Sequence, residues 1–168
     1  MVKVHVLNLI IQTYNNEGKV FACGNGGNVA SVQNLVLDLN MHPFVSEDKS
    51  ARKGVRNKFQ AVSLCDSGAA ITGITNDLGF EYIFSEQLKY QGRQGDVLFA
   101  MSGSGNSKNI IEALKIAKDL DMICVVMTRN QNTKSDAYAD IVLRINSDKS
   151  SFPGQTGGNN NNFHYELM

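Results

Sequence analysis

Three serines gather in one short segment of the chain. Ser102, Ser104 and Ser107 lie within six residues that also include two glycines and an asparagine. Hydroxyl groups donate hydrogen bonds to the oxygens of an anion, and glycines allow the backbone to approach a ligand closely. The segment therefore indicates a binding site for a phosphate group, with a phosphorylated sugar as its natural ligand.

The residues on either side of the serines predict how they are held. The apolar run Val97–Met101 is typical of a strand buried on both faces. The apolar residues that follow recur at helical spacing: Ile110, Ala113, Leu114, Ala117 and Leu120. The serines then precede a helix, where unpaired backbone N–H groups and the positive end of the dipole attract anions. The alternative is that Ser104 or Ser107 caps the helix and the glycines only form a turn.

A second glycine-rich loop occurs earlier in the chain. The segment Gly24–Asn28 reads G-N-G-G-N and lies between an expected strand over Lys19–Cys23 and an expected helix from about Val29 to Leu39. In a parallel sheet the carboxyl ends of the strands meet along one edge, so both loops can contact one ligand. Asp38 lies late in this helix, where the dipole disfavours a carboxylate, and it is either a functional acid or a solvated surface residue.

Strand and helix patterns alternate along the whole chain. The other expected elements are a helix over Val4–Ile11, a strand over Ala61–Leu64, a helix or turn over Ser67–Thr75, a turn at Asn76–Gly79, a helix over Phe80–Tyr90, a strand over Met122–Met127, a polar loop over Thr128–Ser135 and a last strand over Ile141–Ile145. Such alternation predicts an α/β fold, a three-layer α/β/α sandwich with a parallel sheet of about five strands.

Length and composition bound the possibilities further. The 168 residues suggest a single domain, with a long polar loop over Asn40–Lys58 and a flexible, low-complexity segment at about 146–162. Sixteen basic and sixteen acidic side chains cancel, so we expect no nucleic-acid partner. No apolar run approaches a membrane span and no signal peptide is recognisable, which favours a cytoplasmic protein without a membrane partner. The three cysteines are expected to be reduced core residues.

Four spaced motifs together resemble one family. They are G-N-G-G-N at Gly24–Asn28, N-D-L-G-F at Asn76–Phe80, G-R-Q-G-D-V-L at Gly92–Leu98 and S-G-S-G-N-S at Ser102–Ser107. Over roughly Val4 to Ile145 the chain is similar to the sugar isomerase (SIS) domain, and most similar to phosphoheptose isomerases. The resemblance implies a flavodoxin-like SIS fold, a homotetramer with active sites between subunits, and a phosphorylated sugar as substrate. It implies interconversion of sedoheptulose 7-phosphate and D-glycero-D-manno-heptose 7-phosphate, a step in making lipopolysaccharide or capsule heptose.

The resemblance also implies roles for individual residues. Asp38 occupies the position of the catalytic glutamate, and His164 is the histidine nearest to the expected catalytic one. The expected substrate-binding and phosphate-binding residues are Asn25, Gly26, Gly27, Asn28, Asn76, Asp77, Ser102, Gly103, Ser104, Asn106 and Ser107. The isomerisation requires no organic cofactor. The sequence has no Cys/His cluster at the spacing of metal ligands, so we predict no metal.

A second function remains open at this point. A non-catalytic SIS module would bind sugar phosphates or other proteins, as do the SIS proteins that associate with the replication initiator. An intact loop over Ser102–Ser107, which we call the serine loop, is compatible with both functions, whereas isomerase activity also requires the acid and the base.

Overall fold

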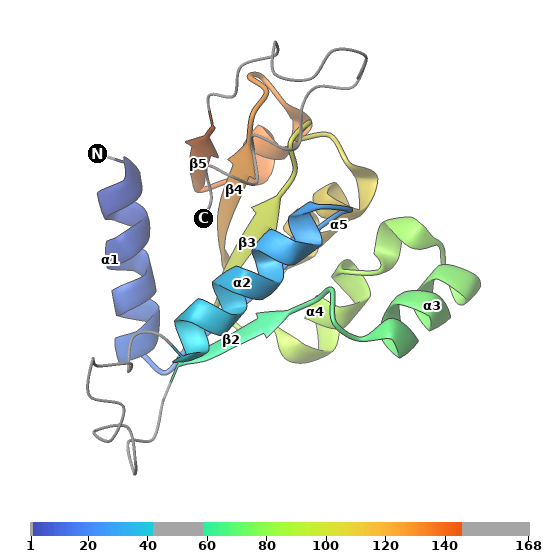
Figure 1. Ribbon diagram of the computed structural model, residues 1–168, viewed down its shortest axis with the longest axis horizontal. Helices are drawn as coiled ribbons and strands as arrows, with labels where there is room; N and C mark the ends of the chain where they lie inside the picture. The colour runs from blue at the N-terminus through green and yellow to red at the C-terminus, as the bar shows by residue number, and fades with distance from the viewer. Residues whose placement is uncertain (1, 42–58, 146–168) are drawn as a thin grey trace.

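The protein is described here by a computed structural model that covers residues 2–41 and 59–145 of the 168-residue chain. Five parallel strands form one sheet in the order β2-β1-β3-β4-β5 (Figure 1). The strands are β1 (Lys19–Gly24), β2 (Gln60–Ser63), β3 (Val97–Met101), β4 (Ile123–Thr128) and β5 (Ile141–Arg144). The predicted parallel sheet of about five strands is confirmed.

Helices cover both faces of this sheet. The helices are α1 (Val2–Asn15), α2 (Asn28–Met41), α3 (Gly68–Asp77), α4 (Ser85–Gln91) and α5 (Lys108–Asp119), with short 3₁₀ helices η3 (Phe80–Tyr82) and η4 (Lys134–Tyr138). Helices α1 and α2 pack on one face, and α4 and α5 pack on the other. The three-layer α/β arrangement predicted from the sequence is therefore confirmed.

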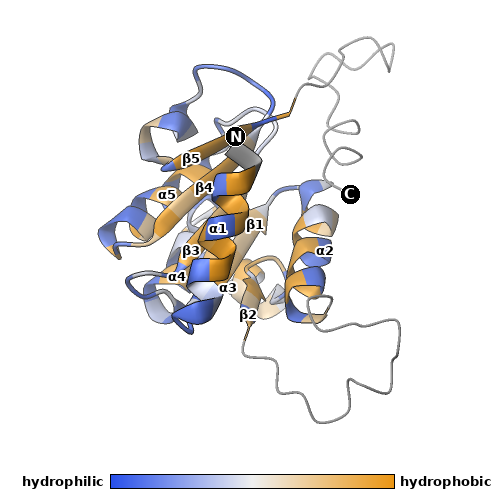
Figure 2. Ribbon diagram, turned by 90° about the vertical axis from the view of Figure 1, so that its left-hand side faces the viewer, coloured by the Kyte–Doolittle hydropathy of each residue, from blue (hydrophilic) through white to orange (hydrophobic). Residues whose placement is uncertain are grey.

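Strand β3 shows why this region of the sequence is continuously apolar. Val97, Phe99 and Met101 pack on the side of α1 and α2, whereas Leu98 and Ala100 pack on the side of α5. Burying each large side chain contributes roughly 1.5–3 kcal/mol, so layers on both faces stabilise this strand. Figure 2 shows the apolar strands lying between helices that have a polar and an apolar side.

The expected helix over Phe80–Tyr90 is wrong in its first half. The spacing of the apolar residues predicts that four of them point inward: Phe80, Ile83, Phe84 and Leu88. The segment instead forms η3 and α4, and Phe80 is 53% exposed, whereas the other three are buried. A 3₁₀ turn rotates each residue further than an α-helix does, so Phe80 leaves the stripe that the other three share.

A second difference concerns the expected turn at Asn76–Gly79. Helix α3 continues through Asn76 and Asp77, and its C-cap is Leu78. Ser67 caps the start of this helix by accepting a hydrogen bond from the backbone of Ala70. The chain therefore leaves the helix at Leu78, one residue after Asn76 and Asp77, rather than turning at these two residues.

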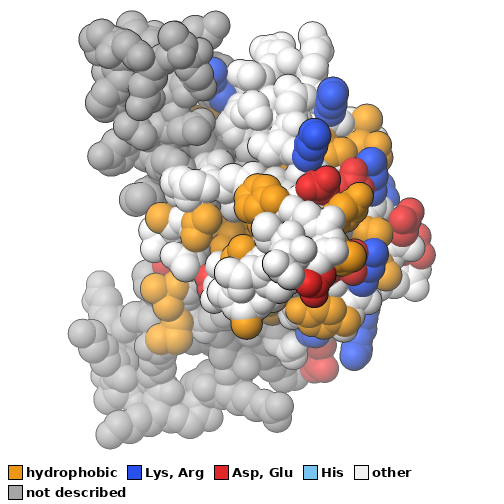
Figure 3. Space-filling view, turned by 90° about the vertical axis from the view of Figure 1, so that its right-hand side faces the viewer, with side chains coloured by type: hydrophobic (Ala, Val, Ile, Leu, Met, Phe, Trp, Pro, Cys, Tyr) orange, Lys and Arg blue, Asp and Glu red, His pale blue; other side chains and the backbone are white. Residues whose placement is uncertain are grey.

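Several expectations lie wholly or partly outside the described residues. These are most of the Asn40–Lys58 loop, the segment at 146–162 and His164. Within the described ranges, none of the helices is long and apolar enough to span a membrane, and no group of three or more acidic, His or Cys side chains could hold a metal ion. Cys23 and Cys124 are buried, Cys65 is half-buried, and none of the three is in a disulfide. Acidic and basic side chains are interspersed on the face shown in Figure 3.

Candidate functional site

The centre of the sheet brings three loops to one edge. Gly24 at the end of β1 pairs with Met101 at the end of β3, and Met101 pairs with Met127 in β4. The chain leaves β1 towards β2 on one side and leaves β3 towards β4 on the other. Ligands of open α/β sheets bind at such a reversal of strand order, beyond the carboxyl ends of the strands.

A cavity of about 140 Å³ lies at this edge, and we call it the serine cavity. Its lining residues are Asn25, Asn28, Met101, Ser102, Gly103, Ser104, Ser107, Arg129 and Asn130. None of these lining residues is acidic, and Arg129 carries a positive charge. The cavity therefore presents hydroxyls, amides and a cation to an anion.

The hydroxyls of the serine cavity are not used to cap α5. Ser107 is the N-cap residue, but its side chain makes no capping hydrogen bond. Its Oγ instead lies 3.3 Å from Ser102 Oγ. Ser102 and Ser104 accept hydrogen bonds from the backbone N–H groups of Gly105 and Asn106, over 3.1 and 3.2 Å respectively. Because those hydroxyls act as acceptors within the loop, their O–H groups can donate to a ligand.

The loop after β1 and the first residue of α2 each supply one asparagine. Asn25 and Asn109 exchange two side-chain hydrogen bonds of 2.8 and 2.7 Å, which join this loop to the first turn of α5. Asn28 is only 5% exposed, and its Nδ2 donates to Met101 O over 3.4 Å. Its Oδ1 is buried without a hydrogen-bond partner among the described residues. A buried acceptor of this kind is costly unless a ligand or water donates to it.

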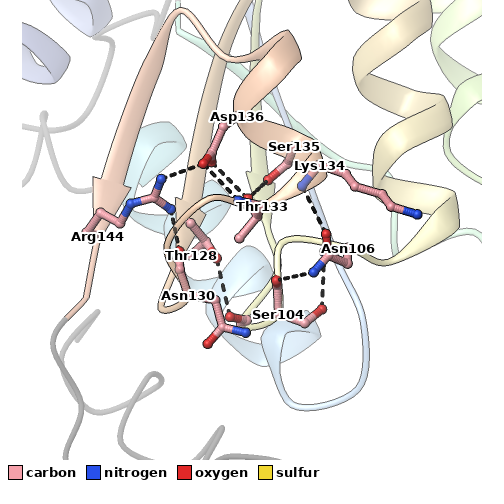
Figure 4. Close-up of polar contacts among 10 residues, drawn as sticks. Ser104, Asn106, Thr128, Asn130, Thr133, Lys134, Ser135, Asp136 and Arg144 are labelled. Carbon is pink, nitrogen blue, oxygen red and sulfur yellow. Dashed lines mark hydrogen bonds and ion pairs between the residues drawn. The ribbon is translucent and has the colours of Figure 1, made fainter.

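Hydrogen bonds join the serine loop to the segment that follows β4 (Figure 4). This segment comprises the loop of residues 129–133 and η4. The backbone N–H groups of Arg129 and Asn130 donate to Gly103 O over 3.2 and 3.4 Å. Further along, Lys134 N–H donates to the Asn106 side chain over 2.9 Å. Asn106, expected as a ligand contact, is thus engaged in joining two segments and does not line the cavity.

Gly105 makes this close approach possible. Its φ of +65° lies in the left-handed region, and a Cβ there would lie 2.5 Å from atoms of Thr133. The backbone O of Gly105 also accepts from Ser135 N–H over 3.1 Å. Only glycine satisfies both the conformation and the contact.

Asp136 and Arg144 neutralise one another beside this loop. Arg144 Nη2 lies 2.6 Å from Asp136 Oδ2, and Arg144 Nη1 donates to Asn130 O. Thr133 and Asp136 complete a capping box for η4. Although partial burial acts to raise it, hydrogen bonds from Arg144 and Thr133 lower the pKa of Asp136 below its ordinary value. Asp136 is therefore paired with Arg144.

Asp38 lies in a separate hollow between α1, α2 and the sheet. The hollow has a volume of about 470 Å³ and is lined by Val6, Ile10, Ser31, Asn34, Leu35, Asp38, Phe99, Met101, Met127 and Leu143. Met101 lines both this hollow and the serine cavity. The predicted base and the predicted phosphate site therefore lie in two depressions that share Met101.

Other predicted residues are placed elsewhere. Gly26 and Gly27 form the turn before α2 and do not line the serine cavity, nor do Asn76 and Asp77. The side chains of Asn76 and Asp77 hydrogen-bond to one another over 2.8 Å at the end of α3. His164 is outside the described residues.

Sequence reasoning missed Arg129 and Asn130. They directly follow β4, which pairs with β3. The signal was present, since polar residues just after a buried strand lie at the same sheet edge as the serines. Choosing them required the strand order, which the sequence alone did not provide.

Comparison with known proteins agrees with this geometry. The SIS domain family model matches residues 5–129. A phosphoheptose isomerase of Neisseria gonorrhoeae is 37% identical over 145 residues, which cover 84% of this chain and 69% of the relative. One from Helicobacter hepaticus is 37% identical over 135 residues, covering 80% of this chain and 64% of the relative.

Solved structures show the same similarity. The structure of a phosphoheptose isomerase from Neisseria gonorrhoeae matches with a TM-score of 0.78 and 30% identity, covering 98% of this chain and 77% of the other. The structure of one from Francisella tularensis matches with a TM-score of 0.80 and 26% identity, covering 98% of this chain and 78% of the other.

Proposed function

Because the chain belongs to the SIS domain family and, within it, to the phosphoheptose isomerases, we propose that it interconverts sedoheptulose 7-phosphate and D-glycero-D-manno-heptose 7-phosphate. The observation that carries this proposal is the serine cavity. Its lining of hydroxyls, amides and one cation, without an acidic side chain, suits a phosphate group. It also lies at the sheet edge where α/β proteins bind ligands.

The adjoining hollow suits the other end of such a substrate. In a heptose 7-phosphate the phosphate is at the opposite end of the carbon chain from the carbonyl that reacts. Asp38 follows Asn28 by ten residues on α2, a rise of about 15 Å along the helix. With the phosphate in the serine cavity, the sugar extends past Met101 into the hollow that Asp38 lines.

The reaction moves a proton between adjacent carbons through an enediol. It requires a base that removes the proton from one carbon and a polar partner that stabilises charge on the oxygens. In our proposal the Asp38 carboxylate removes and returns that proton. His164 protonates the oxygen, and no organic cofactor takes part.

We further propose that the protein acts as a homotetramer. Val4, Leu7 and Ile11 follow one stripe of α1 and are 58%, 56% and 48% exposed, which supports burial of this stripe against another copy. We place the reaction in the cytoplasm, because charged sugar phosphates do not cross membranes unaided. Light scattering at micromolar concentration gives four times the chain mass if the tetramer forms, and a monomer mass contradicts it.

A direct assay tests the proposed activity. Purified protein is incubated with sedoheptulose 7-phosphate, and formation of the aldose phosphate is followed by a coupled assay. Turnover supports the isomerase. Tight binding of sedoheptulose 7-phosphate without turnover contradicts it and favours the non-catalytic sugar-phosphate-binding module.

A further inference from the structure

We propose that Arg129 is the cation of the phosphate site and makes the serine cavity select phosphorylated ligands over neutral sugars. The inference deepens the proposed function and rests on it, since it assigns a specificity-determining residue to the same cavity. Arg129 is absent from the residues that the sequence motifs indicate, and its role follows from three features of its surroundings.

The first feature is the hydrogen bonding of its guanidinium group. Nε and Nη2 both reach Asn130 Oδ1, each over a long 3.4 Å. Nη1 is buried and has no hydrogen-bond partner in the described part of the chain. An arginine offers five N–H donors in a planar fork that matches the oxygens of a phosphate. Most of this donor capacity remains for a ligand in the cavity that Arg129 lines.

The second feature is the charge around the guanidinium. The described residues that share the cavity with Arg129 are neutral. Asp136, the acidic residue of the adjacent capping box, is already paired with Arg144. The positive charge of Arg129 therefore has no anionic partner in the cavity lining, and a phosphate supplies one.

The third feature is the fixed position of the residue. Hydrogen bonds to Gly103 O from Arg129 N–H, Asn130 N–H and Thr128 Oγ1 hold the start of its loop against the serine loop. Arg144 holds the same loop through Asn130 O. A side chain on an anchored backbone loses less freedom on binding, so its contacts contribute more to affinity.

Asn28, another residue of the cavity lining, supports the same inference. Its buried Oδ1 is an acceptor without a described partner, whereas Arg129 Nη1 is a donor without one. A sugar phosphate satisfies both, with a phosphate oxygen accepting from Arg129 and a sugar hydroxyl donating to Asn28.

The test compares Arg129→Gln and Arg129→Lys with the wild-type chain. Calorimetry measures affinity for inorganic phosphate and for sedoheptulose 7-phosphate, and thermal unfolding checks that each variant folds. A charge-assisted hydrogen bond lost from the site weakens binding by roughly one to two orders of magnitude. We expect that loss in Arg129→Gln for both ligands, with partial recovery in Arg129→Lys because the charge returns without the planar fork.

Kinetics separate this role from a structural one. In Arg129→Gln, KM for sedoheptulose 7-phosphate rises by the same factor while kcat stays within about threefold, because the phosphate contact is equal in ground and transition states. Lys134→Gln is the matched control, since it removes a charge from the same segment but its side chain does not line the serine cavity. The affinity of the Lys134→Gln variant for phosphate should stay within about twofold of that of the wild type.

The outcomes distinguish the two proposals. Unchanged affinity of folded Arg129→Gln for both ligands overturns the role of Arg129 and leaves the isomerase intact. An equal loss of affinity in Lys134→Gln also overturns the role of Arg129. Any positive charge near the cavity would then attract phosphate equally, without a specific contact. Binding without turnover in the wild type overturns the isomerase, while the variant affinities still decide the role of Arg129. Failure of the wild type to bind either phosphorylated probe overturns both.

Discussion

Asn25, just after β1, and Asn109, in the first turn of α5, exchange two side-chain hydrogen bonds. Asn109 is 2% exposed and Asn25 is half-buried, so the pair is partly shielded from water. It fixes the Gly24–Asn28 loop to the start of α5, and both segments border the serine cavity.

Replacing Asn109 by Ala should destabilise the protein. The change removes both bonds and leaves the Asn25 amide without its partner, at a cost of roughly 1–3 kcal/mol. For a chain of this length the Tm should fall by about 2–12 °C in calorimetry. In a double-mutant cycle with Asn25→Ala, additive losses would contradict a direct coupling between the two amides.

Replacing Ser104 by Ala should weaken phosphate binding. Its hydroxyl accepts from Asn106 N–H and retains a proton to donate to a charged oxygen, which is worth roughly 1.5–3 kcal/mol. Calorimetry with inorganic phosphate should show a loss of about one to two orders of magnitude. Thr72→Ala is the control, because the Thr72 hydroxyl donates to the backbone of its own helix. Equal affinity in Ser104→Ala and wild type would remove Ser104 from the site.

Replacing Asp38 by Asn should separate chemistry from binding. A positioned general base contributes about 10²–10⁴-fold to rate, so kcat should fall by that factor. Affinity for sedoheptulose 7-phosphate should change little, because the carboxylate acts mainly in the transition state. Asp119→Asn, in the last turn of α5, is the matched control for loss of a carboxylate near a helix end. Full activity in Asp38→Asn would require another base.

Replacing Gly105 by Ala should disrupt the serine loop. The new Cβ meets Thr133 at 2.5 Å and the residue keeps a positive φ, which together cost about 2–5 kcal/mol. Gly26→Ala is the control, since φ is also positive there but nothing lies within 4 Å of the added atom. Its cost should be only about 1–2 kcal/mol. Urea unfolding compares the two, and equal costs would show that the contact with Thr133 does not matter.

The cysteines predict how stability depends on alkaline pH. Burial raises the pKa of Cys124 to about 12, and burial also raises the pKa values of Cys23 and Cys65. Each thiol therefore ionises more readily in the unfolded chain, so the free energy of unfolding should fall as pH rises above about 9. Iodoacetamide at pH 8 should label the native thiols much more slowly than those of the urea-unfolded chain. Rapid labelling of the native protein would contradict their protection.

The sequence predicted best those elements whose pattern follows from burial alone. Strand β3 and the apolar stripe of α5 were predicted because a buried strand and an amphipathic helix have distinct periods. The segment after Gly79 was predicted less well. A 3₁₀ turn there changes the period, and short apolar segments do not reveal it.

The site was predicted in part for a similar reason. The serines were found because their types and spacing are local. Arg129 was missed because its place depends on β4 pairing with β3, a relationship between distant segments. Asn106 was expected among the ligand contacts because it belongs to the Ser102–Ser107 motif that carries the family resemblance. The left-handed turn at Gly105 directs the loop so that the Asn106 side chain meets η4.

The pairing of β1 with β3 also bears on how the chain folds. Val20 pairs with Val97, so the loop between them must close before the central pair can form. Contacts between such distant segments form slowly, and the glycine and serine loops meet only once this pair is in place. A folding intermediate with only β3, α5 and β4 would lack Asn25 and Asn28, and hence part of the lining of the serine cavity. Phosphate would therefore bind fully only to the completed sheet, and its presence would select against such intermediates by mass action.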